Sequence, residues 1–161
     1  MTPVGEATYA ISLGVLAPWG PVSALLERIV APIASPADAT ATGQAIARLD
    51  PGHVVAIHVI EKAGGSIDKA SVEQREVAAK EAFSAFREAL GKDVETDLRY
   101  DTDVTSAIFA AAADHEATAI VFTPRGGSRW VQLLTGDVAL DLITETDRPV
   151  IVLPDSEEAN Q

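Results

Sequence analysis

The sequence predicts an α/β fold in which five parallel strands form one open sheet between two layers of helices, a three-layer sandwich. Short apolar runs rich in Val, Ile and Ala alternate along the chain with longer segments of helical periodicity. Most of these runs are continuously apolar, which is typical of strands buried on both faces. The 161 residues suffice for one domain with a full core, and 47% hydrophobic with 22% charged residues is a globular composition.

The regular pattern begins with the run RIVAPIA, residues 28–34, which we predict to be a buried strand. Ser35 then suits the N-cap of a helix, and Pro36 suits its first position. Apolar residues keep helical spacing until the turn DPG, residues 50–52, ends this helix.

The remaining elements continue the same alternation. We predict strands over residues 53–60, 94–100, 118–123 and 148–154, and helices over residues 67–90, 102–117 and 136–146. The strand VETDLRY, residues 94–100, carries alternating polar residues, so it is expected at an edge of the sheet. One domain is therefore expected over residues 28–154, followed by a polar tail over residues 155–161.

Residues 1–27 precede this domain as an apolar arm. Residues 7–26 carry no charge, and this stretch has the length of a membrane span. Two glycines and two prolines interrupt it, and no Lys or Arg precedes it as in a secretory signal. We therefore expect a cytoplasmic protein whose arm packs on the domain or on a partner subunit, with Trp19 as its anchor. Membrane contact by residues 7–26 is the alternative.

The charge and the cysteine count exclude several functions. A net charge of -12 repels nucleic-acid phosphates and anionic membranes, so no nucleic-acid partner is expected. Such acidity fits a protein of haloarchaeal type from a salty cytoplasm. The chain has no cysteine, which excludes disulfides and thiolate chemistry. We expect structural roles for His53, His58 and His115, and no metal site, because no Asp, Glu and His residues share ligand spacing.

The segment TPRGGSRWVQLLTGD, residues 123–137, follows the fourth predicted strand and is the strongest candidate for a binding loop. In a parallel sheet, ligands bind at the carboxyl ends of strands where the strand order reverses. Glycines before a helix N-terminus let the backbone approach an anion, and two arginines add positive charge. The candidate binding residues are Ile33, Ala34, Thr123, Arg125, Gly126, Gly127, Arg129, Gly136 and Asp137. Their spacing matches neither the P-loop pattern nor G-x-G-x-x-G.

The strands IVAPIAS and VVAIHVI, with the last third AIVFTPRGGSRWVQLLTGDVALDLITETDRPVIVLP, resemble the universal stress protein family over residues 28–154. The resemblance implies a Rossmann-like, adenine nucleotide alpha hydrolase-like fold. It also implies a homodimer formed through the last strand, here Val150 to Leu153. An apolar edge strand would otherwise be an association hazard.

Nucleotide-binding members of that family carry Gly-x-x-Gly-x9-Gly-Ser/Thr after the fourth strand and an aspartate just after the first. Gly126 and Gly136 match the second and third glycines. Thr123 stands in place of the first glycine, Asp137 in place of the hydroxyl residue, and Ala34 in place of the aspartate. A branched side chain hinders backbone approach, and a carboxylate in the first helical turn repels phosphate.

The resemblance therefore implies a non-enzymatic, dimeric stress-response or regulatory protein with a degenerate nucleotide loop and no required cofactor. Two alternatives stay open. The first is an ATP-binding switch with slow hydrolysis, in which Arg125 and Arg129 hold an anion or Asp137 holds the nucleotide through Mg²⁺. The second is a soluble regulatory module of a membrane transporter.

Overall fold

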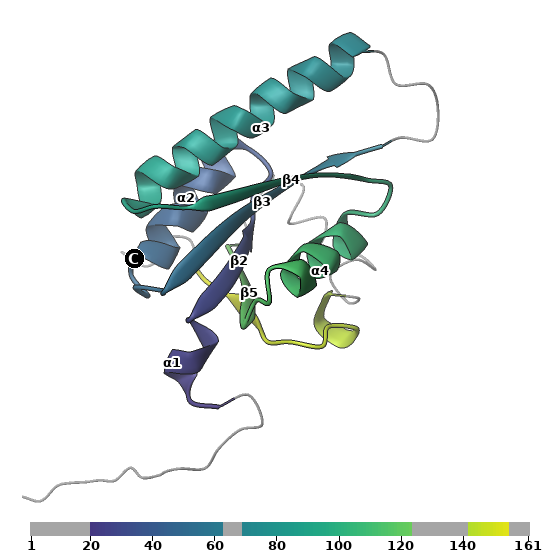
Figure 1. Ribbon diagram of the computed structural model, residues 1–161. Helices are drawn as coiled ribbons and strands as arrows, with labels where there is room; N and C mark the ends of the chain where they lie inside the picture. Colours follow the sequence, from purple (N-terminus) through teal and green to yellow (C-terminus); the bar gives the residue numbers. More distant parts are fainter. Residues whose placement is uncertain (1–19, 63–68, 124–141, 155–161) are drawn as a thin grey trace, which may run out of the picture.

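The computed structural model describes residues 20–62, 69–123 and 142–154 (Figure 1). In chain order the elements are α1 (Val22–Leu25), β2 (Arg28–Pro32), α2 (Pro36–Ala47), β3 (His53–Glu61), α3 (Lys69–Leu90), β4 (Glu95–Asp101), α4 (Val104–Asp114), β5 (Ala119–Phe122) and β6 (Val150–Val152). The strands form one sheet in the order β4-β3-β2-β5-β6, and every neighbouring pair is parallel. The predicted five-stranded parallel sheet is confirmed, and so is the edge position of the strand around Glu95–Asp101.

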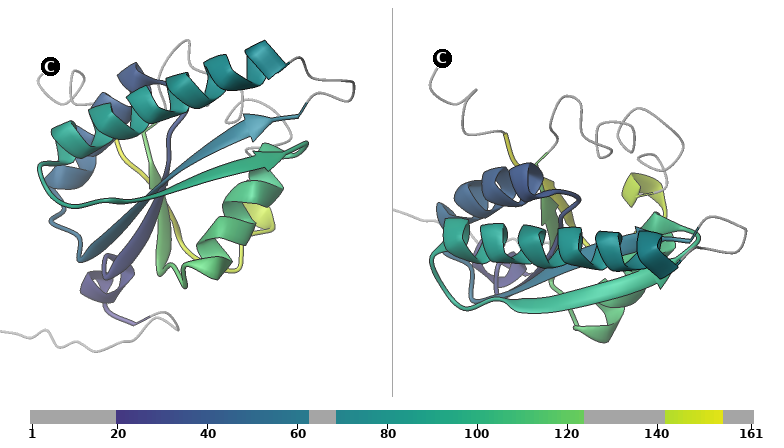
Figure 2. Two further views of the ribbon diagram at one scale, coloured as in Figure 1. Left: turned by 45° about the horizontal axis from the view of Figure 1, so that its top comes forward. Right: turned by 90° about the horizontal axis from the view of Figure 1, so that it is seen from above.

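Helices cover both faces of this sheet (Figure 2). On one face, α2 and α3 pack on alternate strand residues, and Phe86 of α3 is fully buried there. On the other face, α4 packs on the intervening strand residues around Val30, Val55 and Ile120. The alternation of side chains along a strand produces these two cores, which together hold the central strands rigidly in place.

Sequence signals placed the start of α2 correctly. Ser35 is its N-cap, and the Ser35 hydroxyl accepts a hydrogen bond of 3.2 Å from the Asp38 backbone N–H. Pro36 occupies the first helical position, where its missing N–H costs nothing. Ile33, just beyond β2, still donates its N–H to the Ile57 carbonyl at 2.8 Å, so pairing with β3 continues past Pro32.

The last strand is shorter than predicted, because β6 covers only Val150–Val152 instead of residues 148–154. Arg148 takes part in a turn instead: its N–H donates to the Thr146 hydroxyl at 3.2 Å. The Arg148 guanidinium donates to the carbonyls of Ala112 and Ala117 at 2.6 and 3.1 Å. Arginine is a favourable partner for carbonyl groups left open at the end of a helix. Of the helix predicted over residues 136–146, residues 142–146 lie in the described part. Residues 142–144 are helical, whereas 145 and 146 are not, so the helix ends two residues earlier than predicted.

The end of the predicted apolar arm forms the short helix α1 at the amino-terminal end of β2 (Figure 1). The carbonyls of Leu25, Leu26 and Glu27 accept hydrogen bonds from Thr118, Gly52 and His53 at 2.8, 2.9 and 2.8 Å, respectively. This junction is therefore fixed to β3 and β5. Within residues 20–62, 69–123 and 142–154, no helix is long and apolar enough to cross a bilayer.

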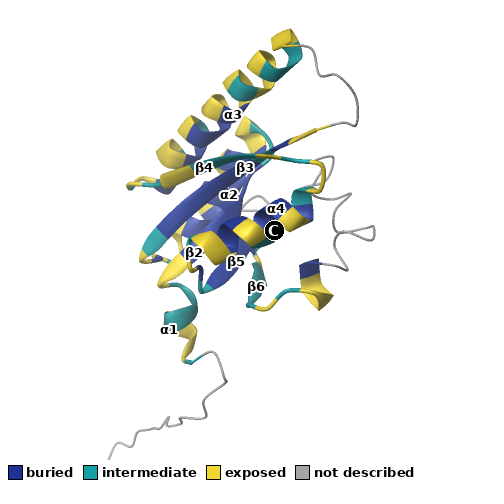
Figure 3. Ribbon diagram, turned by 45° about the vertical axis from the view of Figure 1, so that its right-hand side comes forward, coloured by how far each residue is buried: buried dark blue, intermediate teal, exposed yellow. Residues whose placement is uncertain are grey.

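The edge strands β4 and β6 both carry partly exposed residues (Figure 3), but their residue types differ. β4 carries charged residues, and its Asp97 and Arg99 form an ion pair of 2.7 Å. β6 has the sequence VIV, and Val152 is 47% exposed. Charged residues protect an edge strand from pairing with another chain, whereas an uncharged apolar edge favours such pairing.

Candidate functional site

The strand order reverses between β2 and β5, which lie side by side at the centre of the sheet. This is the switch point at which open α/β sheets bind ligands, beyond the carboxyl ends of the strands. Three predicted site residues lie there within the described chain: Ile33 and Ala34 after β2, and Thr123 after β5. The other predicted residues, Arg125, Gly126, Gly127, Arg129, Gly136 and Asp137, lie outside the described residues.

Thr123 is only 4% exposed, and its hydroxyl lies 2.6 Å from the hydroxyl of Thr42, which is 2% exposed. Thr42 belongs to α2. The side chain of Thr123 therefore packs under α2, and one hydroxyl of the pair donates to the other. Nothing local in the sequence pairs Thr42 with Thr123, which lies 81 positions further along the chain.

Ile33 is held by β3 through both of its backbone polar groups. Its N–H donates to Ile57, and its carbonyl accepts a 3.0 Å hydrogen bond from Nδ1 of His58. Because a carbonyl can only accept, this nitrogen carries the proton. The His58 ring also meets Phe83 edge to face, with ring centres 6.3 Å apart and planes at 77°. His58 thus fixes the backbone at the end of β2.

Burial lowers the pKa of His58 below its ordinary value, and the hydrogen bond to Ile33 opposes this effect only in part. The neutral ring is therefore the form favoured in the fold, so the folded-state pKa lies below the unfolded-state value of about 6.5. As the pH falls below about 6.5, the unfolded chain binds a proton that the folded chain does not bind. The stabilisation that the neutral His58 ring gives above that pH therefore decreases as the pH falls. The decrease stops once the pH is below the folded-state pKa of His58.

We expect the free energy of unfolding to fall by up to ~1.4 kcal/mol per pH unit as His58 resists protonation below about pH 6.5. Urea unfolding of the wild type and of His58→Asn, whose amide can still donate to Ile33, measures this difference. The wild type should show the steeper loss of stability in this pH window. Equal slopes for the two proteins would show that His58 is not the group responsible.

Ala34 is half-buried and packs against the core on the α4 side. It offers no polar side-chain atom at the end of β2. The next acid along the chain, Asp38, is 5% exposed in the first turn of α2. A carboxylate in that position stabilises the helix through its dipole, which gives Asp38 a structural reason for being there.

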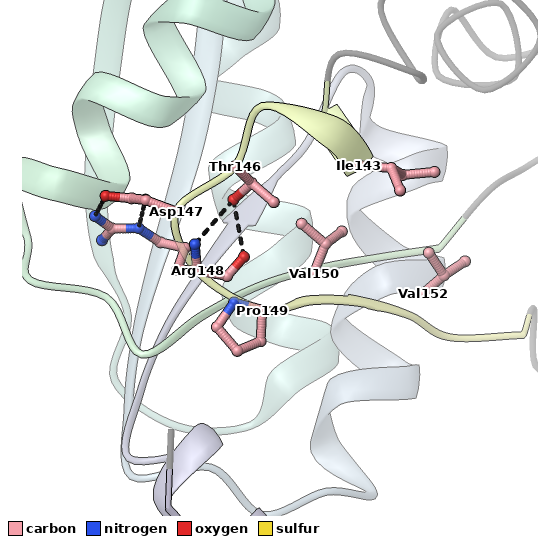
Figure 4. Close-up of a pocket in the computed structure, with 7 residues that line it drawn as sticks. All are labelled: Ile143, Thr146, Asp147, Arg148, Pro149, Val150 and Val152. Carbon is pink, nitrogen blue, oxygen red and sulfur yellow. Dashed lines mark hydrogen bonds and ion pairs between the residues drawn. The ribbon is translucent and has the colours of Figure 1, made fainter. Parts of the chain in front are cut away.

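A groove lies beside β6 (Figure 4). Its lining residues are Ile143, Thr146, Asp147, Arg148, Pro149, Val150 and Val152. The polar members bind one another: Thr146 bonds with the Arg148 backbone, and the Arg148 side chain pairs with Asp147 at 2.8 Å. Ile143 is 61% exposed at the rim. The polar groups of the groove are thus bonded to one another, and Ile143, Val150 and Val152 form its apolar wall.

The amino-terminal ends of β3 and β4 carry a network that sequence reasoning missed. Glu95 lies 2.8 Å from Nε2 of His53 and 3.4 Å from Nδ1 of His115, and His115 also lies 2.8 Å from Asp97. Burial alone would raise the pKa of Asp97, but hydrogen bonds from Arg99 and His115 hold it below its ordinary value. In the described part of the chain, no group of three or more His, Asp and Glu residues is arranged to hold a metal ion. The network stabilises the β4 edge.

A comparison of the whole chain with known protein families agrees with this fold of five parallel strands. The model of the universal stress protein family matches residues 26–154. The chain belongs to the universal stress protein family. The match covers every described strand and both loops of the switch point, so the resemblance seen in the sequence is confirmed at the level of the family.

Solved universal stress proteins share the fold at low identity. One from Archaeoglobus fulgidus in complex with dAMP has 22% identity and a TM-score of 0.58, covering 80% of this chain and 98% of that chain. One from Lactobacillus plantarum has 20% identity and a TM-score of 0.57, covering 80% and 97%. Another, in complex with cAMP, has 16% identity and a TM-score of 0.55, covering 81% and 98%. No curated protein sequence matches the chain significantly.

Proposed function

We propose that this universal stress protein is a non-enzymatic, dimer-forming regulatory domain of a cytoplasmic stress response, whose nucleotide site keeps its frame but has lost most of its affinity. The observation that carries the proposal is Thr123, whose branched side chain is buried under α2 and bound to Thr42 at 2.6 Å. Thr123, the first residue of the loop, is thereby attached to α2.

The relatives solved with dAMP and cAMP make a nucleotide the ligand class to consider. A phosphate cradle needs backbone N–H groups that the ligand can approach closely. Thr123 places a Cβ and two further atoms at the start of the loop, where a glycine would leave space. Ala34 supplies no carboxylate at the carboxyl end of the neighbouring strand β2. Both differences weaken a nucleotide site without changing the sheet.

The chemistry of this strand end also supports a non-enzymatic role. Thr42, Thr123 and His58 supply hydroxyls and an imidazole, yet their hydrogen bonds join them to one another or to the backbone. A general base must reach the proton that it removes, either directly or through one water. Here the imidazole proton on Nδ1 is directed at Ile33, which is a structural role.

Titration with fluorescent ATP and Mg²⁺ tests the loss of affinity. We expect a dissociation constant above about 1 mM for the wild type. The double variant Ala34→Asp, Thr123→Gly should bind at least about tenfold more tightly, which is ~1.4 kcal/mol. Ala37→Asp is the matched control, because it adds the same charge at an exposed position in the first turn of α2. It should leave affinity unchanged.

Tight binding by the wild type would overturn this part of the proposal. A micromolar dissociation constant that depends on Mg²⁺ would favour the ATP-binding switch instead. Hydrolysis of unlabelled ATP, followed in the same samples, would overturn the non-enzymatic assignment.

The proposed homodimer forms through the last strand and its flank, Val150 to Leu153. This edge has no charged residue, whereas the opposite edge strand β4 is charged and tied into ion pairs. A second copy pairing antiparallel with β6 would cover Val152, which is 47% exposed. Because each copy has a net charge of -12, salt should strengthen the dimer by screening the repulsion between copies.

Sedimentation at micromolar concentration in low and high KCl measures this association. We expect a dimer in the wild type and a monomer in Val152→Asp, since the variant buries a carboxylate in the interface. The control Tyr100→Asp changes a residue that is 39% exposed on the opposite edge strand, and it should remain dimeric. A wild-type monomer at both salt concentrations would contradict the proposal.

A further inference from the structure

The outer side of β6 has no partner strand within the described residues, because β6 ends the sheet order. The apolar groove of Figure 4 lies directly beside it, with Ile143, Val150 and Val152 along its wall. Ile143 and Val152 are 61% and 47% exposed. A segment that pairs with β6 could therefore bury its alternate side chains in this groove.

The sequence before the described residues contains such a segment. In TYAISLGV, residues 8–15, large apolar side chains occupy positions 9, 11, 13 and 15, and small residues occupy positions 8, 10, 12 and 14. This period of two is the pattern of a strand with one apolar face. The segment has no charge and no proline, so nothing in it opposes pairing with an edge.

The position at which the described chain begins puts β6 within reach. Leu25, Leu26 and Glu27 are bonded at the amino-terminal ends of β2, β3 and β5. A strand beyond β6 would lie three strand spacings from β2, about 14 Å. The residues between 16 and 21 can span roughly 20 Å. A segment that runs along β6 and then reaches this end of the sheet must run antiparallel to β6. Antiparallel edge strands are common on otherwise parallel sheets.

We propose that residues 8–15 dock on the outer side of β6 of the same chain as an antiparallel strand, with Tyr9, Ile11, Leu13 and Val15 facing the groove. The docked segment covers the edge that the proposed dimer uses. It therefore competes with the second copy, and this regulatory consequence rests on the proposed function. The docking itself does not.

Disulfide trapping in the full chain tests the docking, because the chain has no cysteine of its own. Val152→Cys is combined in turn with each of Tyr9→Cys, Ile11→Cys, Leu13→Cys and Val15→Cys. A second series combines Val152→Cys with Ala10→Cys, Ser12→Cys and Gly14→Cys. A disulfide needs Cβ atoms about 4 Å apart and correctly directed. Same-face positions of a strand are about 7 Å apart, so only one of them can lie opposite position 152. We expect one pair of the first series to form an intramolecular disulfide at least about tenfold faster than any pair of the second.

Controls separate docking from chance encounter. Each arm cysteine is also combined with Tyr100→Cys on the opposite edge strand, which should trap no faster than the second series. Equal rates across both series, or equal rates with positions 152 and 100, would overturn the proposal. Products that have only the mass of two chains would assign the edge to a second copy and would also overturn it.

The competition has its own measurement. Ile11→Asp combined with Leu13→Asp removes the apolar face of the segment, so the dissociation constant of the dimer should fall at least about tenfold. Ser12→Asp combined with Gly14→Asp adds the same charge on the other face and serves as the matched control. An unchanged constant overturns the competition. If neither the wild type nor any variant dimerises, the proposed dimer and the competition are both wrong. The disulfide series would still test the docking.

Discussion

Replacing Phe86 with alanine is expected to lower the free energy of unfolding by about 3–5 kcal/mol. Phe86 is fully buried, and it belongs to the core between the sheet and the helices α2 and α3. Truncation removes most of the ring contacts and leaves a cavity that the neighbouring helices and strands can close only in part. Urea unfolding followed by circular dichroism measures the loss.

Two companion variants make this result specific. Phe86→Leu keeps much of the volume and should lose clearly less stability than Phe86→Ala. Glu88→Ala, at an exposed position of the same helix, should stay within about 0.5 kcal/mol of the wild type. A loss below about 1 kcal/mol for Phe86→Ala would be smaller than any fully buried aromatic side chain should give.

Replacing Gly52 with alanine is the second large expected effect, a loss of roughly 2–3 kcal/mol. A Cβ at Gly52 would lie 2.6 Å from the carbonyl oxygen of Glu27, so the backbone must move. That movement disturbs the hydrogen bonds from Gly52 to Leu26 and from His53 to Glu27, both of which join β3 to the end of the arm. Thermal and urea unfolding should both report the loss.

Gly91 provides the matched comparison. Its φ is +76°, and no atom lies within 4 Å of a Cβ built there. Gly91→Ala therefore carries only the strain of a left-handed backbone, on the order of 1 kcal/mol. If Gly52→Ala were no worse than Gly91→Ala, the close approach to Glu27 would not be what requires a glycine at position 52.

The order of strands and helices could be predicted because it depends on local patterns. The N-cap Ser35 followed by Pro36 marks the start of α2, and the charged run around Asp97 marks an edge strand. The start of the last strand was predicted less well. A turn that joins Thr146 to Arg148 takes residues that an apolar pattern assigns to a strand.

The candidate site depends on contacts that no local pattern contains. Thr42 and Thr123 are 81 positions apart, and His58 and Ile33 are 25 positions apart. A buried threonine is as compatible with helical periodicity as an alanine is, so its hydroxyl partner becomes visible only when the strands are placed. The network of His53, Glu95 and His115 was missed for the same reason, since it joins the starts of two strands to the end of a helix.

Arg148 helps to fix the register of the last strand. β6 has only three residues, so few backbone hydrogen bonds with β5 hold its register. A slip by one residue would exchange the faces on which Val150 and Ile151 pack, which belong to different cores. The guanidinium is bonded to the carbonyl of Ala112 in α4 and to that of Ala117 between α4 and β5, so such a slip would break these two hydrogen bonds as well. One side chain outside the strand thus reinforces the register that the backbone hydrogen bonds with β5 set.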